Sequence, residues 1–251
     1  MQRKRLYFDI ETSPNIVFSW RVGYKISLDY DNIIKERKII CACWKWEGKA
    51  EVHSAAWSSG QSDVRLLQKL IKALNEADEI VGHNGDKFDL PWVRTRAIKL
   101  GLKVPPGYKT TDTLKLARRF FNFNSNRLDY LAKYLGVGEK IKTEFGMWKK
   151  ICLENDEKAL DRMVRYCKRD VKVLERVHQA MLPYVPVSHN HAILHDGGKA
   201  DCPECGSTRV RINKTRTTLM GQIRRTMLCN NCGRYFVISD KTYRDSKGIS
   251  E

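Results

Sequence analysis

The sequence lacks any run of about 18 apolar residues, the length that a helix needs to cross a membrane. Residues 1–5 also lack the apolar stretch of a secretory signal peptide and lead directly into a strand-like run. No internal repeat or low-complexity tract interrupts the chain. We therefore expect a cytosolic, cytoplasmic protein with no membrane association.

Acidic residues are outnumbered by basic ones: 29 Asp and Glu stand against 46 Lys and Arg, which gives a formal net charge of +17. This charge favours a polyanionic partner, with nucleic acid ahead of an anionic membrane surface. An evenly solvated basic surface is the alternative explanation. The 251 residues suffice for one domain of about 180 to 200 residues and a small accessory unit.

Hydrophobic periodicity predicts an α/β domain in the first three quarters of the chain. The expected strands are 6–11, 38–46, 50–57, 79–82 and 108–111, and the expected helices are 62–77, 90–100, 113–119, 128–135 and 157–182. A meander of three strands followed by alternating helices and strands implies a mixed sheet with helices on its faces. Residues 13–36 are interpreted as an irregular insertion.

Two carboxylates interrupt the first apolar strand, in the run Phe8-Asp9-Ile10-Glu11-Thr12. Side chains two residues apart in a strand point to the same face, so Asp9 and Glu11 present paired negative charges there. Such a pair suits a divalent cation. The alternative is that the strand has ended and both acids are solvated loop residues.

A second acidic block, residues 83–91, lies between a predicted strand and a predicted helix, where α/β sheets leave a crevice for ligands. Asp89 is a candidate metal ligand in this block, although the N-cap of the following helix is an alternative role for it. Asn84 and Lys87 are candidate substrate contacts or ordinary loop residues. Asp112 is interpreted as the cap of the next helix.

A third block places Tyr166 four residues before Asp170, so the two side chains are neighbours on one helix face. They share a stripe with Met163, Val173 and Val177 that is predicted to face the protein. A buried aspartate is costly unless a partner or a metal compensates its charge. A salt bridge to a nearby Lys or Arg is the alternative to a metal.

Together the three blocks resemble, in order and spacing, the three motifs of the DEDD superfamily of 3′–5′ exonucleases. The tyrosine at position 166 makes the resemblance one to the tyrosine subclass, DEDDy. It covers roughly residues 5–182, and residues 11–15 with the C-terminal cysteines are most similar to phage-type exonucleases that carry a zinc ribbon. The resemblance implies an RNase H-like fold, with a mixed five-stranded sheet and flanking helices.

The resemblance also implies a role for each matched residue. Asp9, Glu11, Asp89 and Asp170 would hold two Mg²⁺ or Mn²⁺ ions, with Asp9 bridging them, and Tyr166 would orient the attacking water. Two such ions suit phosphodiester hydrolysis, because they generate a nucleophile at neutral pH and neutralise charge on the departing 3′ oxygen.

Four C-terminal cysteines form two C-x-x-C pairs, Cys202 with Cys205 and Cys229 with Cys232, separated by 23 residues. This spacing predicts one structural Zn²⁺ in a small zinc ribbon. The ribbon either contacts nucleic acid, which its charge favours, or a protein partner. Basic residues between the pairs are Arg209, Arg211, Lys214, Arg216, Arg224 and Arg225. The other cysteines are interpreted as ordinary buried residues: Cys41, Cys43, Cys152 and Cys167.

The predicted organisation is a nuclease domain at 1–185, a linker at 186–199, a zinc ribbon at 200–240 and a tail at 241–251. The expected function is a metal-dependent 3′–5′ exonuclease that acts on nucleic acid, with single-stranded DNA favoured over RNA. An RNA-processing exonuclease is the alternative within the same chemistry. A non-catalytic nucleic-acid-binding adaptor is the alternative from another class, and a protein partner such as a polymerase stays open.

Overall fold

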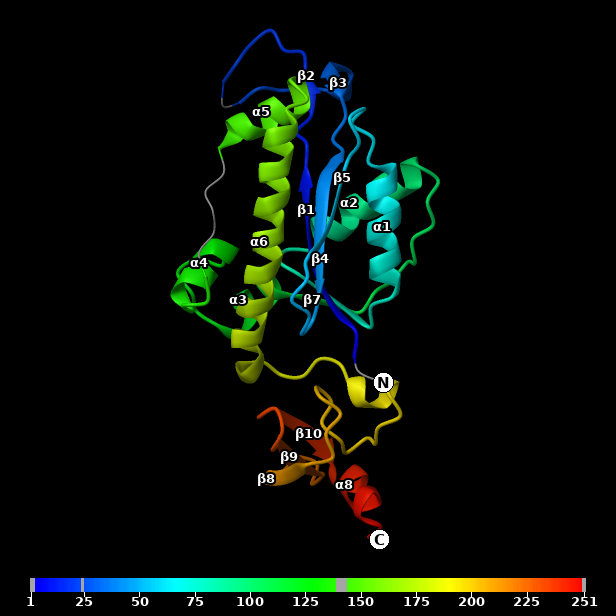
Figure 1. The fold of residues 1–251 in the computed structure, drawn as a ribbon. Coiled ribbons are helices and arrows are strands. Elements are labelled where there is room, and N and C mark those ends of the chain that lie inside the picture. The colour runs from blue at the N-terminus through cyan, green and yellow to red at the C-terminus, as the bar shows by residue number, and fades with distance from the viewer. Residues whose placement is uncertain (1–2, 24, 139–143, 250–251) are drawn as a thin grey trace. The chain divides into compact units, whose positions relative to one another are not determined.

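The computed structural model describes residues 3–23, 25–138 and 144–249, whose fold is drawn in Figure 1. None of the helices in these ranges combines the length and apolar character that membrane crossing requires. The cytosolic location expected from the sequence stays a prediction.

The chain divides into two compact units, Lys4–His178 and a second unit made of Arg3 and the residues from Gln179 onward. The domain boundaries expected from the sequence stay predictions. In the first unit the main strands are β1 (Arg5–Thr12), β4 (Ile39–Trp46), β5 (His53–Ala56), β6 (Glu79–Gly82) and β7 (Thr110–Asp112). The helices are α1 (Val64–Asn75), α2 (Asp89–Lys99), α3 (Thr113–Phe120), α4 (Leu128–Tyr134), α5 (Phe145–Leu153) and α6 (Glu157–Met181), which runs on into the second unit.

The five strands form one mixed sheet in the order β5-β4-β1-β6-β7. β4 is antiparallel to both β1 and β5, whereas β6 is parallel to β1 and β7 is parallel to β6. The predicted mixed five-stranded sheet with flanking helices is therefore confirmed. Because β1, β6 and β7 run in the same direction, their carboxyl ends face the same edge of the sheet.

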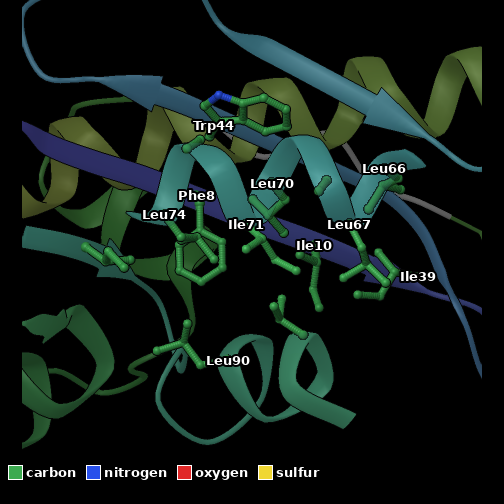
Figure 2. Close-up of a cluster of buried hydrophobic side chains, with 14 of the residues drawn as sticks. Phe8, Ile10, Ile39, Trp44, Leu66, Leu67, Leu70, Ile71, Leu74 and Leu90 are labelled. Carbon is green, nitrogen blue, oxygen red and sulfur yellow. The ribbon is translucent and has the colours of Figure 1, made fainter. Parts of the chain in front are cut away.

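Helix α1 covers one face of the sheet, where its apolar side chains meet Phe8 and Ile10 of β1 (Figure 2). The α1 side chains recur three or four residues apart and so form one stripe along the helix. They are Leu66, Leu67, Leu70, Ile71 and Leu74. Since side chains alternate along a strand, burying Phe8 and Ile10 under α1 sends Asp9 and Glu11 to the opposite face.

The opposite face of the sheet is covered by α5 and α6, on the other side of the sheet from α1 in Figure 1. Tyr7, Cys41 and Cys43 of the sheet pack there against buried residues of α6 such as Met163 and Cys167. All four cysteines that were predicted to be ordinary buried residues are buried. This face is where the acidic side chains of β1 and α6 meet.

Two parts of this unit differ from the sequence prediction. The insertion at 13–36 is not wholly irregular, because β2 (Ile16–Val17) and β3 (Ile33–Lys35) pair as a small antiparallel sheet around a short 3₁₀ helix, η1 (Tyr30–Asn32). Helix α5 was not predicted. It is nine residues long and buries only Ile151 and Cys152, too short a stripe to reveal a helical period.

The second unit contains a three-stranded antiparallel sheet in the order β10-β9-β8. Its elements are η2 (Leu182–Tyr184), α7 (His191–Leu194), β8 (Val210–Thr217), β9 (Ile223–Cys229), β10 (Tyr235–Ser239) and α8 (Asp240–Lys247). Met227 and Phe236 form the centre of its small apolar core with Ile238 and two of the cysteines. The four clustered cysteines and this sheet are consistent with the predicted zinc ribbon.

Candidate active site and metal centres

Three carboxylates meet between β1 and α6. Each of Asp9, Glu11 and Asp170 offers one oxygen, and these oxygens all lie within 4.8 Å of one another. β1 supplies the first two from one face, and Asp170 projects from α6 with only 4% of its surface exposed. Carboxylates this close repel each other, and a bound cation offsets this electrostatic repulsion. The three acids therefore form a candidate site for a hard divalent ion.

Tyr166 and Asp170 lie one turn apart on the face of α6 that packs against the sheet. Tyr166 is 7% exposed, and the predicted stripe of Met163, Val173 and Val177 is buried with it. The prediction that this face of the long helix points into the protein is confirmed. The tyrosine hydroxyl and the acidic cluster consequently belong to the same side of the sheet.

Asp89 lies beside this cluster but outside the group of three. It is the first residue of α2, whose N-cap is Phe88, so the alternative role of Asp89 as the helix cap is wrong. Its Oδ1 instead accepts a hydrogen bond of 3.1 Å from the backbone N–H of Ile10, the residue after Asp9. Burial raises the pKa of Asp89 well above its usual range, and the carboxylate of Asp9 adds to this rise. A cation near both carboxylates would offset these costs.

The loop after β6 carries Asn84 and Lys87 and is fixed by Asp112. Asn84 has a positive φ of 66°, a conformation that asparagine tolerates better than most residues. Its N–H donates to Oδ1 of Asp112 over 2.9 Å, and the same carboxylate caps α3 at Leu114. The predicted cap at Asp112 is confirmed, and its second role was not anticipated. Asn84 is half-buried and Lys87 exposed, so both are accessible from the loop.

Two glycines let this loop fold tightly against the end of β6. A Cβ atom added at Gly82 would lie 3.0 Å from the Cα of Gly85, and one added at Gly85 would lie 3.2 Å from the Cα of Gly82. The aromatic ring of Phe8 packs against the same place. The close approach of the two backbones thus requires residues without a side chain.

Cys167 was interpreted as an ordinary buried cysteine, yet its thiol contacts the acidic cluster. Its Sγ lies 3.5 Å from both the backbone oxygen and Oδ2 of Asp9. Burial raises the pKa of the Cys167 thiol well above its usual range, so the thiol keeps its proton and can donate it to the carboxylate. Cys167 therefore acts as a positioning residue for Asp9.

Two further side chains hold the carboxyl end of β1, and the sequence analysis identified neither. Trp148 of α5 donates from Nε1 to the backbone oxygen of Thr12 over 3.1 Å. Arg37 donates to the backbone oxygen of Ser13 over 3.1 Å and stacks over the ring of Trp92. No sequence signal links these residues, because each contact joins positions that are more than 20 residues apart.

The second candidate metal centre is the cluster of Cys202, Cys205, Cys229 and Cys232, whose sulfurs all lie within 4.8 Å of one another. Two of the pairs, Cys202 with Cys232 and Cys205 with Cys229, are 3.6 Å apart. A tetrahedral zinc ion with bonds of 2.3 Å separates its sulfur ligands by about 3.8 Å. The four thiols thus fit one zinc ion closely.

Backbone amides at the two cysteine pairs further suit thiolate ligands. Burial alone would raise the pKa of Cys229, but hydrogen bonds from the N–H groups of Cys232 and Asn231 and from neighbouring thiols lower it to about 7. At Cys202 burial outweighs the amide donors of Cys205 and Glu204 and raises the pKa to about 11. Such amide donors stabilise the deprotonated sulfur that zinc requires.

Comparison with known proteins shows the family. The model of the RNase H superfamily matches residues 34–182, more than half of the chain. A DNA polymerase of Pyrococcus glycovorans is 25% identical over 203 residues, covering 72% of this chain and 25% of the polymerase. DNA polymerase 1 of Pyrococcus abyssi is 26% identical over 145 residues, covering 49% of this chain and 18% of that protein.

A solved structure shows the same fold. The family B DNA polymerase from the hyperthermophilic archaeon Pyrobaculum calidifontis superimposes with a TM-score of 0.56 at 21% identity, covering 72% of this chain and 25% of the polymerase chain. The chain thus spans at most about a quarter of these polymerases, and the similarity concerns one part of each. From its sheet, its helices and its match over residues 34–182, the chain belongs to the RNase H superfamily.

Proposed function

We propose that this protein is a metal-dependent 3′–5′ exonuclease of the tyrosine subclass of the DEDD superfamily, acting on single-stranded DNA. The convergence of Asp9, Glu11 and Asp170 between β1 and α6 is the observation that carries the proposal. Membership of the RNase H superfamily and similarity to DNA polymerases support it. The closer likeness to phage-type exonucleases is part of the same proposal.

The donor set fits magnesium or manganese. Every candidate ligand is a carboxylate oxygen, which is the ligand type that these hard ions prefer. Asp9, Glu11, Asp89 and Asp170 would hold two Mg²⁺ or Mn²⁺ ions. When bound, such a pair activates water at neutral pH and neutralises charge on the departing 3′ oxygen.

The chain's own groups have separate tasks in this reaction. The hydroxyl of Tyr166 orients the attacking water by hydrogen bonding. The thiol of Cys167 and the amide of Ile10 hold Asp9 and Asp89 in place. Asn84 and Lys87 contact the substrate from the loop that Asp112 fixes. In the second unit the four cysteines hold one structural Zn²⁺, a role that needs no part in cleavage.

A panel of oligonucleotides labelled at the 5′ end tests this proposal. Single-stranded DNA, duplex DNA and RNA of the same sequence are incubated with the full chain and either Mg²⁺, Mn²⁺ or no divalent ion. A ladder of products that shorten from the 3′ end, seen for single-stranded DNA and only with the ion, is expected. A ladder from RNA alone would overturn the DNA preference and favour the RNA-processing alternative.

The adaptor alternative has its own outcome in the same panel. A non-catalytic nucleic-acid-binding protein would bind the labelled strands but leave every one of them at full length under all ion conditions. The presence of all four acids and the tyrosine argues against that outcome. The charge of +17 suits both functions, so charge alone does not separate them.

A further inference from the structure

The segment between Cys205 and Asp240 contains no acidic residue. Its 34 residues carry seven basic side chains, those of Arg209, Arg211, Lys214, Arg216, Arg224, Arg225 and Arg234. A stretch of one charge sign is a favourable surface for a polyanion where the charges share one face. The register between the strands decides which of the seven basic side chains share a face.

One face of the sheet β10-β9-β8 is packed. Ile212, Met227 and Phe236 are paired across the three strands and form part of the small apolar core. Arg225 belongs to this face, two residues from Met227 along β9. Its guanidinium binds Asp240 at the start of α8. The guanidinium of Arg225 is therefore occupied by its ion pair with α8.

The other face, which we call the outer face, carries the exposed basic side chains. Lys214 pairs with Thr226, and Arg216 pairs with Arg224, so these residues point away from the packed face. Arg211, opposite Leu228, joins them on the same side. The outer face thus presents four exposed basic residues, three of them along β8: Arg211, Lys214, Arg216 and Arg224.

The far strand of the outer face is aromatic and apolar instead of basic. Tyr235 is 49% exposed and Val237 is 61% exposed, whereas Phe236 and Ile238, which alternate with them along β10, are buried. Beside them lies a hollow of about 640 Å³ that Tyr235, Val237, Lys199 and residues 183–190 line. An exposed aromatic ring beside a hollow gives an unpaired base a surface for stacking.

We propose that the outer face binds a single nucleic acid strand, with phosphates along the basic residues of β8 and bases directed towards Tyr235 of β10. Basic side chains with an adjacent aromatic platform are the combination by which proteins hold single strands without reading their sequence. The inference deepens the proposed function, since it names where the chain holds its polymer. Binding at this face nevertheless requires no cleavage.

The test measures binding of a labelled single-stranded DNA by fluorescence anisotropy. It uses the full chain in the Asp170→Asn background without added Mg²⁺ or Mn²⁺, so that a failure of nuclease activity leaves the readout intact. The variant combines Arg211→Ala, Lys214→Ala, Arg216→Ala and Arg224→Ala. We expect affinity to fall at least tenfold. The slope of log affinity against log salt should become less steep by about 3, because four phosphate contacts are lost.

A matched control removes four exposed basic residues from the first unit, Arg65, Lys69 and Lys72 of α1 and Lys99 of α2. It has the same net charge as the test variant and should keep most of the affinity. Equal losses in the two variants, or no loss in the test variant, would overturn the proposal. If the test variant lost affinity for duplex DNA but kept its affinity for single-stranded DNA, the proposal that this face binds a single strand would be overturned.

The zinc content of the quadruple variant reports whether its second unit is folded. If it folds poorly, single substitutions at two positions keep the proposal testable. Arg216→Glu, at an exposed position, should weaken binding of single-stranded DNA severalfold with one zinc ion retained. Tyr235→Ala should also weaken it, and Tyr235→Phe should restore it, because the phenyl ring still stacks. Wild-type affinity in both Arg216→Glu and Tyr235→Ala would contradict the inference.

Discussion

The thiol of Cys167 on α6 lies 3.5 Å from Oδ2 of Asp9 on β1. The helix that contributes Asp170 therefore also fixes the orientation of a carboxylate on the neighbouring strand. A contact of this kind aligns the ligands of a metal before the metal binds, as outer-shell partners do in metal sites generally.

Replacing this thiol should weaken metal use without abolishing chemistry. In Cys167→Ala we expect the Mn²⁺ concentration for half-maximal cleavage to rise about tenfold, because loss of such outer-shell partners typically costs 10- to 100-fold in metal affinity or activity. Cys152→Ala is the control, since Cys152 is also buried but lies on α5 and not on β1, β4 or α6. Equal ion requirements in the two variants would show that Cys167 only fills space.

The pair Asp63–Arg96 should contribute strongly to stability. The guanidinium binds the buried carboxylate through two hydrogen bonds of 2.7 and 2.8 Å, and the same carboxylate accepts from the N–H of Ile39. Breaking a buried pair typically costs about 3 to 5 kcal/mol. We therefore expect Asp63→Asn to lower the free energy of unfolding in urea by about 3 kcal/mol at pH 7, whereas exposed Asp129→Asn should change little.

The same pair gives a pH dependence. Burial alone would raise the pKa of Asp63, but the hydrogen bonds from Arg96 and Ile39 outweigh it and lower the pKa. A lowered folded-state pKa gives a stabilisation that is present above about pH 4 and lost as the pH falls further. The stability difference between wild type and Asp63→Asn should shrink below pH 4. A difference that stays constant down to pH 3 would contradict this account.

Gly85 should be required for activity more than for folding. In Gly85→Ala the new methyl group would lie 3.2 Å from the Cα of Gly82, so the loop that carries Asn84 must shift. Small displacements of positioning residues are costly, and we expect kcat/KM to fall roughly tenfold or more. Gly60→Ala, where nothing lies within 4 Å, serves as the control and should cleave at the wild-type rate.

Elemental analysis of the purified chain tests the cysteine cluster. We expect one zinc ion per chain, and Cys205→Ser should lose it together with the cooperative unfolding transition of the second unit. Cys152→Ser should keep its zinc, because Cys152 lies in the other unit. Full zinc content in Cys205→Ser would rule out the four-sulfur site.

The sequence predicted those features that depend on local periodicity. Alternation in β1 predicted that Asp9 and Glu11 share one face of the strand, and helical spacing predicted that Tyr166 and Asp170 lie on the buried stripe of α6. The C-x-x-C spacing indicated the thiol cluster in the same way. Each of these patterns repeats within a few residues and can be read without knowing the tertiary contacts.

Contacts between distant segments could not be predicted in this way. The thiol of Cys167 meets Asp9 only because α6 packs on that face of the sheet, and Asp112 reaches Asn84 because β7 lies beside β6. The outer face of the ribbon likewise depends on the strand register. A bulge between Ile212 and Lys214 sets which basic residues share that face.

The acids of β1 and α6 form the proposed nuclease site. The most direct test compares Asp170→Asn with Asp161→Asn, an exposed change on the same helix, by following a 5′-labelled DNA strand in Mn²⁺. Asp161→Asn should shorten the strand from its 3′ end at the wild-type rate, while Asp170→Asn should bind the strand but leave it at full length. Cleavage at the wild-type rate in Asp170→Asn would contradict the account.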